Sequence, residues 1–207
     1  MAERLHRRWI GIDITHLAIA LMKNRLHDAF AGDLSPCRVI GEPQDLGSAQ
    51  ALAQGNRYQF QYWALSLVNA RPEGEPKRGA DRGIDGNLFF LDDNSGKAKR
   101  CVLQVKSGKV QAATMHALKG VMDREKAEMA ALIALEEPTQ PTRTEAAEAG
   151  FYHAGGLGLE KTVPRLQILT VQELLEGRKL ELPQAHGAAT FQKAPRQPKA
   201  QRTRPTP

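Results

Sequence analysis

The stretch from Gly79 to Lys106 constrains the fold of this 207-residue chain more than any other. An acidic residue, Asp85, lies in the tight turn 83–86, and two apolar runs follow at Asn87–Leu91 and Cys101–Lys106. A cluster rich in Asp, Asn, Ser and Gly separates these two runs. Apolar runs divided by turn-forming residues predict a β-hairpin.

The predicted hairpin brings chemically useful groups together. Side chains alternate along a strand, so Gln104 and Lys106 point to one face and Val105 to the other. Asp85 begins one strand and Lys106 ends its antiparallel partner, which places the two ends side by side. Carboxylate and amide oxygens suit Mg²⁺, and a lysine beside the metal can orient or deprotonate an attacking water. The competing interpretation is a solvated hairpin with scattered charges.

The order of an Asp, a hairpin and then Gln-x-Lys resembles the PD-(D/E)xK nuclease superfamily, in the Mrr-like branch where Gln replaces the usual second acid. The resemblance maps the metal-binding acid onto Asp85, the second metal position onto Gln104 and the catalytic lysine onto Lys106. It also makes the carbonyl of Val105 a possible metal ligand. It implies Mg²⁺ as the cofactor and DNA as the substrate.

The predicted helix before the hairpin departs from that family. Residues 57–68 place Phe60, Ala64 and Leu65 on one face, as in a core helix. In the Mrr-like family this helix often supplies a further Glu to the site, but here the candidate positions hold Gln59 and Gln61. An amide is a weaker Mg²⁺ ligand than a carboxylate, so the departure weakens the prediction of cleavage and leaves the predicted fold unchanged.

Basic residues around the hairpin are candidates for contact with DNA phosphates. The loop before the turn also contains Asp81, which ranks below Asp85 as the metal ligand because Asp85 leads directly into the strand. A solvated loop is the alternative interpretation. The predicted DNA-binding residues are Lys77, Arg78, Arg82 and Lys109.

The elements after the hairpin predict an α/β fold. A helix is expected over 112–128, a buried strand over 129–135, a short helix after a capping box at 142–145, a strand over 165–169 and a helix after a second capping box at 170–173. Together with the hairpin and its preceding helix, this order matches a restriction-endonuclease-like αβββαβ core in which one strand is not assigned.

The first thirty residues have a different character. A short apolar strand is expected at 8–14, with Thr15 as the cap of a helix that runs to about Phe30. The words RRWIGIDITHLAIALMKNRL resemble the second strand and helix of the S-adenosylmethionine-binding fold in β-class DNA amino-methyltransferases, which maps the ribose-binding acid onto Asp13. That family's Gly-rich loop and Asp/Ser-Pro-Pro-Tyr motif do not occur in this sequence. S-adenosylmethionine binding is therefore expected only if a methyltransferase partner or fusion supplies the missing part.

These patterns divide the chain into four parts. Residues 1–30 are the methyltransferase-like strand-helix fragment, 31–56 a linker, 57–183 the nuclease-like domain, and 184–207 a basic tail expected to be disordered. The formal net charge is +6, but the tail holds five Lys or Arg and no acid, so the remainder carries about +1. Nucleic-acid binding therefore needs a local basic face together with the tail.

Composition excludes several classes of protein. No apolar run approaches the length that spans a bilayer, and no secretory signal with a cleavage site is recognisable. The two cysteines, Cys37 and Cys101, lack a metal-ligand spacing, and the six histidines form no zinc motif. We expect a reduced, cytoplasmic protein that does not contact membranes.

Two functions follow, and we keep both. The first is a Mg²⁺-dependent DNA endonuclease of a restriction-modification protein, which could act as a homodimer because double-strand cleavage usually needs two active sites. The second is a non-catalytic DNA-binding or target-recognition module in the C-terminal part of a site-specific DNA methyltransferase. Binding that persists in EDTA and in an Asp85→Ala variant favours the second function.

Overall fold

The computed structural model describes residues 2–30, 33–73, 83–92, 97–154 and 162–183. Their central feature is a five-stranded sheet in the order β1-β2-β3-β4-β7. The first three strands pair antiparallel, and β3, β4 and β7 pair parallel. The strands are β1 (Arg71–Pro72), β2 (Gly86–Phe90), β3 (Lys99–Lys106), β4 (Met129–Ala134) and β7 (Leu166–Thr170).

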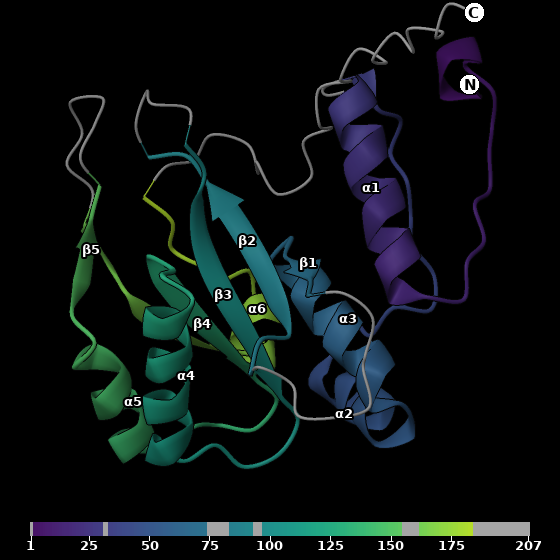
Figure 1. Ribbon diagram of the computed structural model, residues 1–207. Helices are drawn as coiled ribbons and strands as arrows, with labels where there is room; N and C mark the ends of the chain where they lie inside the picture. Colours follow the sequence, from purple (N-terminus) through teal and green to yellow (C-terminus); the bar gives the residue numbers. More distant parts are fainter. Residues whose placement is uncertain (1, 31–32, 74–82, 93–96, 155–161, 184–207) are drawn as a thin grey trace, which may run out of the picture.

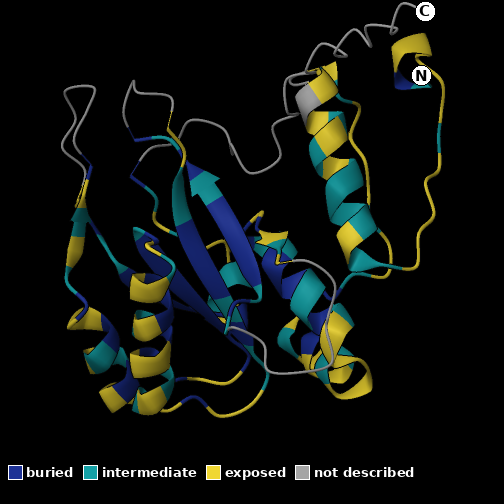
Figure 2. Cartoon of the chain, in the orientation of Figure 1, coloured by how far each residue is buried: buried dark blue, intermediate teal, exposed yellow. Residues whose placement is uncertain are grey.

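Helices cover both faces of this sheet (Figure 1). On one face α3 packs with α2 and α6 over a core that includes the fully buried Phe60 and Trp63. On the other face α4 and α5 pack over a second core around Met115 and Leu118. The sheet strands are correspondingly the most continuously buried part of the chain (Figure 2). The helices are α2 (Leu46–Gly55), α3 (Arg57–Leu67), α4 (Ala112–Arg124), α5 (Gln140–Ala147) and α6 (Val171–Leu175).

The predicted αβββαβ order is present as α3-β1-β2-β3-α4-β4. The strand that the sequence left unassigned is β1, which has only two residues and lies within a stretch expected to be a loop. One of the two is Pro72, which has no N–H to donate, and such a residue is tolerated at the edge of a sheet. A two-residue edge strand carries no periodic signal, which explains why it was missed.

Helix α2 lies within the stretch assigned to a linker, yet it is part of the core. It begins at Leu46, where Asp45 and Ser48 form a reciprocal capping box. The Asp45 carboxylate accepts from the Ser48 N–H at 2.7 Å. Ala49 is fully buried against α3, so the second half of the segment assigned to a linker contributes to the folded domain.

Two further predictions at the C-terminal half had different outcomes. The capping box at 170–173 is confirmed, with Thr170 accepting from the Glu173 N–H at 3.1 Å. The capping box at 142–145 is wrong, because α5 begins at Gln140 and Thr142 is fully buried with its hydroxyl near the carbonyl of Val110. A small hairpin of β5 (Phe151–His153) and β6 (Thr162–Pro164) was not predicted.

The segment that follows α6 is held beside β7 by the side chain of Gln167. The Gln167 carboxamide donates to the carbonyl of Glu181 at 2.8 Å and accepts from its N–H at 3.0 Å. Leu180 and Leu182 pack against the core beside it. The side chain of Gln167 thereby pairs with this segment as a neighbouring peptide group would.

The N-terminal part lies beside α3, outside the two covered faces (Figure 1). Helix α1 (His16–Phe30) forms as predicted, with Thr15 Oγ1 accepting from the Ala18 N–H at 3.2 Å. The strand predicted at 8–14 is wrong: this segment pairs with no strand among the residues described. None of the described helices is long and apolar enough to cross a bilayer.

Candidate functional site

The turn that carries Asp85 is built from two glycines with different roles. Gly83 has φ +74°, a left-handed conformation that favours glycine. A Cβ on Gly86 would lie 2.6 Å from a methyl of Leu65 on α3, so only glycine lets β2 start this close to the helix. The turn therefore fixes Asp85 at the junction of β2, β3 and α3.

Hydrogen bonds to both the backbone and the side chain hold Asp85 in place. Its N–H donates to the carbonyl of Leu103 at 2.8 Å, continuing the β2–β3 ladder. Its carboxylate Oδ2 accepts from the Val105 N–H at 2.7 Å, and Oδ1 accepts from the Gln61 carboxamide at 3.0 Å. Both carboxylate oxygens are thus engaged, one by β3 and one by α3.

Gln104 and Lys106 lie on β3 next to this carboxylate. Gly86 pairs with Leu103, so the residue across the ladder from Asp85 is Gln104. Alternation puts Lys106, the last residue of β3, on the same face as Gln104, and both are half-buried. The Gln104 Oε1 atom is buried and has no hydrogen-bond partner among the described residues. A buried acceptor without a donor is uncommon in a native fold and marks a place where a ligand or water can bind.

The structure separates the two glutamines that sequence could not rank. Gln61 reaches Asp85, so it occupies the helix position at the site. Gln59 instead accepts from the N–H of His16 at 3.2 Å and connects α3 to the start of α1. The helix contribution to the site is therefore an amide, and it comes from Gln61.

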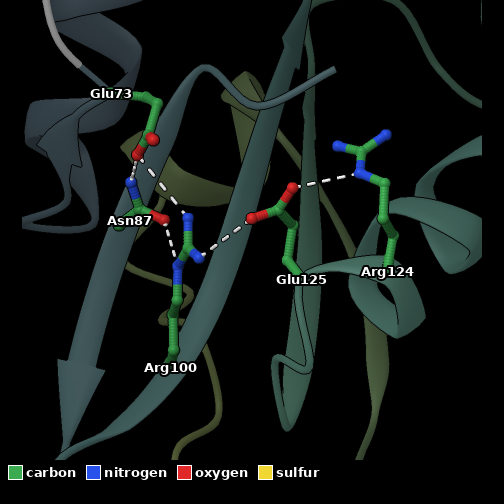
Figure 3. Close-up of polar contacts among 5 residues, drawn as sticks. All are labelled: Glu73, Asn87, Arg100, Arg124 and Glu125. Carbon is green, nitrogen blue, oxygen red and sulfur yellow. Dashed lines mark hydrogen bonds and ion pairs between the residues drawn. The ribbon is translucent and has the colours of Figure 1, made fainter. Parts of the chain in front are cut away.

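A second acidic residue, Glu73, is joined to Asp85 by a backbone hydrogen bond. Its N–H donates to the carbonyl of Asp85 at 3.1 Å. Its side chain, however, accepts from Asn87 and pairs with Arg100 at 3.6 Å (Figure 3). Glu73 was not predicted as part of this region, because its partner on β3 is far away in sequence and belongs to no motif.

Arg100 is the centre of this polar network (Figure 3). Its Nε donates to Asn87 Oδ1 at 2.7 Å, and its guanidinium pairs with Glu125 at 3.4 Å. A hydrogen bond from Arg124, with a further contribution from Arg100, holds the pKa of Glu125 below its ordinary value. The network joins β2, β3 and the end of α4, and it engages the Glu73 carboxylate.

The other predicted site residues are either exposed or outside the described part of the chain. Lys109 is exposed just after β3. Asp13 is exposed and accepts from both the N–H and the hydroxyl of Thr15 at 2.8 Å, which lowers its pKa and places it at the start of α1. Lys77, Arg78, Asp81 and Arg82 lie outside the described residues. Within the described parts of the chain, no group of three His, Cys, Asp or Glu side chains is arranged to hold a metal.

This mixed sheet with helices on both faces has the architecture of a restriction-endonuclease-like domain. Residues 58–176, more than half of the chain, match a family described as NACHT-associated inactive restriction endonuclease 1, and the chain belongs to that family. The name of the family describes its members as inactive.

Comparison with solved structures finds the MspJI restriction endonuclease in complex with a 27-mer oligonucleotide. The match has a TM-score of 0.43 and 13% sequence identity, and it covers 82% of this chain and 35% of that one. The chain thus spans about a third of the length of the MspJI chain. No curated protein matches the sequence.

Proposed function

We propose that this domain binds DNA without hydrolysing it. The observation that carries the proposal is the hydrogen bond from the Gln61 carboxamide to Asp85 Oδ1. The Asp85 carboxylate already accepts from the Val105 N–H through its other oxygen. The acid that a Mg²⁺ ion would need is therefore occupied on both sides by N–H donors.

The oxygen atoms that could bind Mg²⁺ also carry little negative charge. Mg²⁺ binds oxygen ligands in near-octahedral geometry and usually relies on carboxylates to offset the cost of losing water. Here the described site offers one carboxylate, from Asp85, and one amide oxygen, from Gln104, while Glu73 is paired with Arg100. The residues fit Mg²⁺ only if Gln61 turns its side-chain oxygen inward, and the family's description as inactive is consistent with a site that does not load the metal.

DNA is the partner we propose because the family is described as inactive restriction endonucleases and because two lysines lie at one end of β3. Lys106 ends the strand and Lys109 lies exposed three residues later. Neither makes an ion pair with another described residue, so both ammonium groups are available to phosphates within that part of the chain. We propose that Lys77, Arg78 and Arg82 add to this contact.

A nicking assay combined with a binding assay tests the proposal. We expect the protein to retard a duplex oligonucleotide in EDTA and to leave supercoiled plasmid uncut in Mg²⁺ or Mn²⁺. Asp85→Ala should bind DNA as the wild type does, while Lys106→Glu with Lys109→Glu should weaken binding at least tenfold and reduce its salt dependence. Metal-dependent nicking that Asp85→Ala abolishes would overturn the non-hydrolytic assignment, and absence of binding at low salt would overturn the DNA assignment.

A second candidate is a Mg²⁺-dependent DNA endonuclease, which the buried, unpartnered Oε1 of Gln104 favours. In that case Asp85, Gln104 and the Val105 carbonyl would hold the metal, which would activate the attacking water and stabilise the charge on the phosphate. Lys106 would orient that water and offset charge on the scissile phosphate. Lys106→Ala would then abolish nicking while DNA binding persists, and a variant that still cuts would refute this role.

The first thirty residues support a link to a DNA methyltransferase, and we propose that the domain works beside one, as a partner or fusion. Asp13 is engaged by Thr15, and the Gly-rich loop of such enzymes is missing, so we expect the chain alone not to bind S-adenosylmethionine. Calorimetric titration of the chain with S-adenosylmethionine should give no heat of binding. A saturable signal lost in Asp13→Ala would contradict that expectation.

A further inference from the structure

The segment from Arg8 to Ile14 is extended and carries a row of isoleucines that face water. Ile10, Ile12 and Ile14 are 90%, 88% and 94% exposed. They alternate with Trp9, Gly11 and Asp13, which is the pattern of a strand with one apolar face. Three alternate isoleucines at this exposure form an apolar patch of the kind that a monomer usually buries.

Contacts at both ends hold this segment in its extended form. At the start, the indole of Trp9 donates to Glu3 at 2.6 Å, and Glu3 also accepts from the N–H of Ser35 at 2.8 Å. At the end, Asp13 accepts from the backbone and side chain of Thr15. These contacts fix both ends of the segment, which lowers the entropy cost of ordering it on binding.

Helix α1 approaches the segment at Gly11. A Cβ on Gly11 would lie 3.6 Å from the sulfur of Met22, so the Gly11 side rests on α1 and the isoleucines point away from it. No described side chain of α1 is buried, although the helix is rich in apolar residues (Figure 2). Among the described residues, no peptide group from residue 8 to residue 14 hydrogen bonds to another peptide group.

We propose that a second copy of this chain pairs with this segment, so that residues 8–14 of two protomers form a two-stranded antiparallel ladder. An exposed, apolar strand with unpaired peptide groups is a template for pairing with another strand. The alternation of isoleucine with other residues is self-complementary, because two identical strands related by a two-fold axis can place all six isoleucines on one face.

Charge selects one register of this ladder. With Gly11 opposite Gly11 of the partner, Ile10 lies opposite Ile12, and Arg7 lies diagonally across from Asp13, twice by symmetry. Shifting the ladder so that Ile12 faces Ile12 also keeps the isoleucines together. That register brings the two Asp13 carboxylates into diagonal contact and requires Arg8 to pair with His16, which is already the first residue of α1.

Sedimentation velocity over a concentration series tests the dimer. The wild-type chain should shift from monomer to dimer between about 1 and 100 μM, and Ile12→Asp should weaken association at least tenfold. Ile40→Asp is the matched control, because Ile40 is 85% exposed but lies outside the segment, and it should dimerise as the wild type does. A wild-type chain that stays monomeric throughout, or an Ile12→Asp chain that still dimerises, would overturn the proposal.

Disulfide trapping tests the register in a Cys37→Ser background, since Cys37 is exposed and Cys101 is buried. Opposed residues of an antiparallel ladder have Cα atoms about 4.5–5.5 Å apart, within the range a disulfide spans. A mixture of Ile10→Cys and Ile12→Cys chains should cross-link efficiently under mild oxidation, and each variant alone should not. Efficient cross-linking of Ile12→Cys by itself, or none in the mixture, would refute this register.

Discussion

At the residue scale, the proposal of a domain that does not cleave DNA depends on one side chain, Gln61. Glutamine and glutamate have nearly the same shape. At position 61 the glutamine brings an N–H donor to Asp85 Oδ1, where a glutamate would bring a second negatively charged oxygen. The donor stabilises the Asp85 carboxylate without any metal. The site is thus satisfied by its own side chains, except at Gln104 Oε1.

Replacing that donor should create a metal site. In Gln61→Glu, two carboxylates lie within hydrogen-bond distance, so their repulsion favours a divalent cation between them and beside Gln104. We expect Mn²⁺ to bind at least about tenfold more tightly than to the wild type, which corresponds to about 1.4 kcal/mol. Electron paramagnetic resonance of free Mn²⁺ measures this directly.

Gln59→Glu is the matched control for that experiment. A glutamate there can still accept from the His16 N–H, because the acceptor oxygen is retained. It should leave Mn²⁺ affinity at the wild-type value. Equal Mn²⁺ binding by the wild type and Gln61→Glu would mean that Gln61 does not control access to the site.

The sequence predicted the strand register around Asp85, because the period of a strand and the pairing of a hairpin fix which residues lie opposite one another. The roles of Asp85, Gln104 and Lys106 stay predictions. Choosing between Gln59 and Gln61 was beyond such reasoning, since it depends on how α3 is rotated against the sheet. The pairing of Glu73 with Arg100 depends on β1, whose two residues leave no pattern to recognise.

At the scale of elements, the close approach of β2 to α3 depends on Gly86. An added methyl would lie 2.6 Å from a Leu65 methyl and 3.1 Å from the Arg71 carbonyl, so the helix or the edge strand must move. We expect Gly86→Ala to lower the free energy of unfolding by about 1–3 kcal/mol, as overpacking does. Urea denaturation followed by circular dichroism measures it.

Gly108→Ala serves as the comparison for Gly86→Ala. No heavy atom lies within 4 Å of a Cβ at Gly108, and that residue is exposed. Its urea midpoint should match or slightly exceed that of the wild type. If Gly86→Ala unfolds at the same midpoint as Gly108→Ala, the packing of Leu65 is looser than the structure indicates.

The cap of α2 makes stability depend on pH. A hydrogen bond from the backbone N–H of Ser48, joined by that from its side chain, lowers the pKa of Asp45 below its ordinary value of 3.8. A carboxyl whose folded pKa is lowered stabilises the fold fully above pH 3.8, and this contribution is lost as pH falls through the folded pKa. Asp45→Ala should therefore melt a few degrees below the wild type at pH 7, and the gap should close in acid.

Asp45→Asn separates the charge from the hydrogen bond. Asparagine caps a helix nearly as well but does not titrate in this range. Its melting temperature should stay close to that of the wild type at pH 7 and lack the acid dependence that Asp45 contributes. A gap between wild type and Asp45→Ala that persists unchanged to pH 2 would show that the carboxylate charge is not involved.

Long and strongly patterned elements were predicted best. Helix α3, the β2–β3 hairpin, β4 and the Thr170 capping box each have an apolar period or a cap that specifies them locally. The start of α5 was misjudged because Thr142 resembles a capping residue, and only the packing against α4 buries it. Hairpin β5–β6 has three-residue strands, too short for periodicity to detect.

At the scale of the whole molecule, the two cores of the sheet are independent of the N-terminal part. Helix α1 contacts α3, yet none of its described side chains is buried. A chain that begins at residue 36 should therefore unfold in one cooperative transition, with a free energy of unfolding within about 1 kcal/mol of the full chain. Denaturation of both chains at 1 μM tests this, and a loss of several kcal/mol would mean that α1 is part of the domain's core.

The prediction of an α/β domain succeeded because alternation of strands and helices leaves few ways to cover a mixed sheet. The prediction of a strand at 8–14 was wrong because a strand needs a neighbour to pair with, and the described chain provides none. Its sequence specifies the extended form and the apolar face, while pairing depends on what lies beside it.

The hydrogen bonds between Gln167 and the segment after α6 bear on the solubility of the protein. An open parallel edge rich in Leu and Ile is where misfolded chains add to one another. By donating to and accepting from the peptide of Glu181, the Gln167 side chain holds the segment after α6 beside β7. Loss of these two hydrogen bonds should free the segment, so we expect Gln167→Ala to precipitate more readily than the wild type on heating.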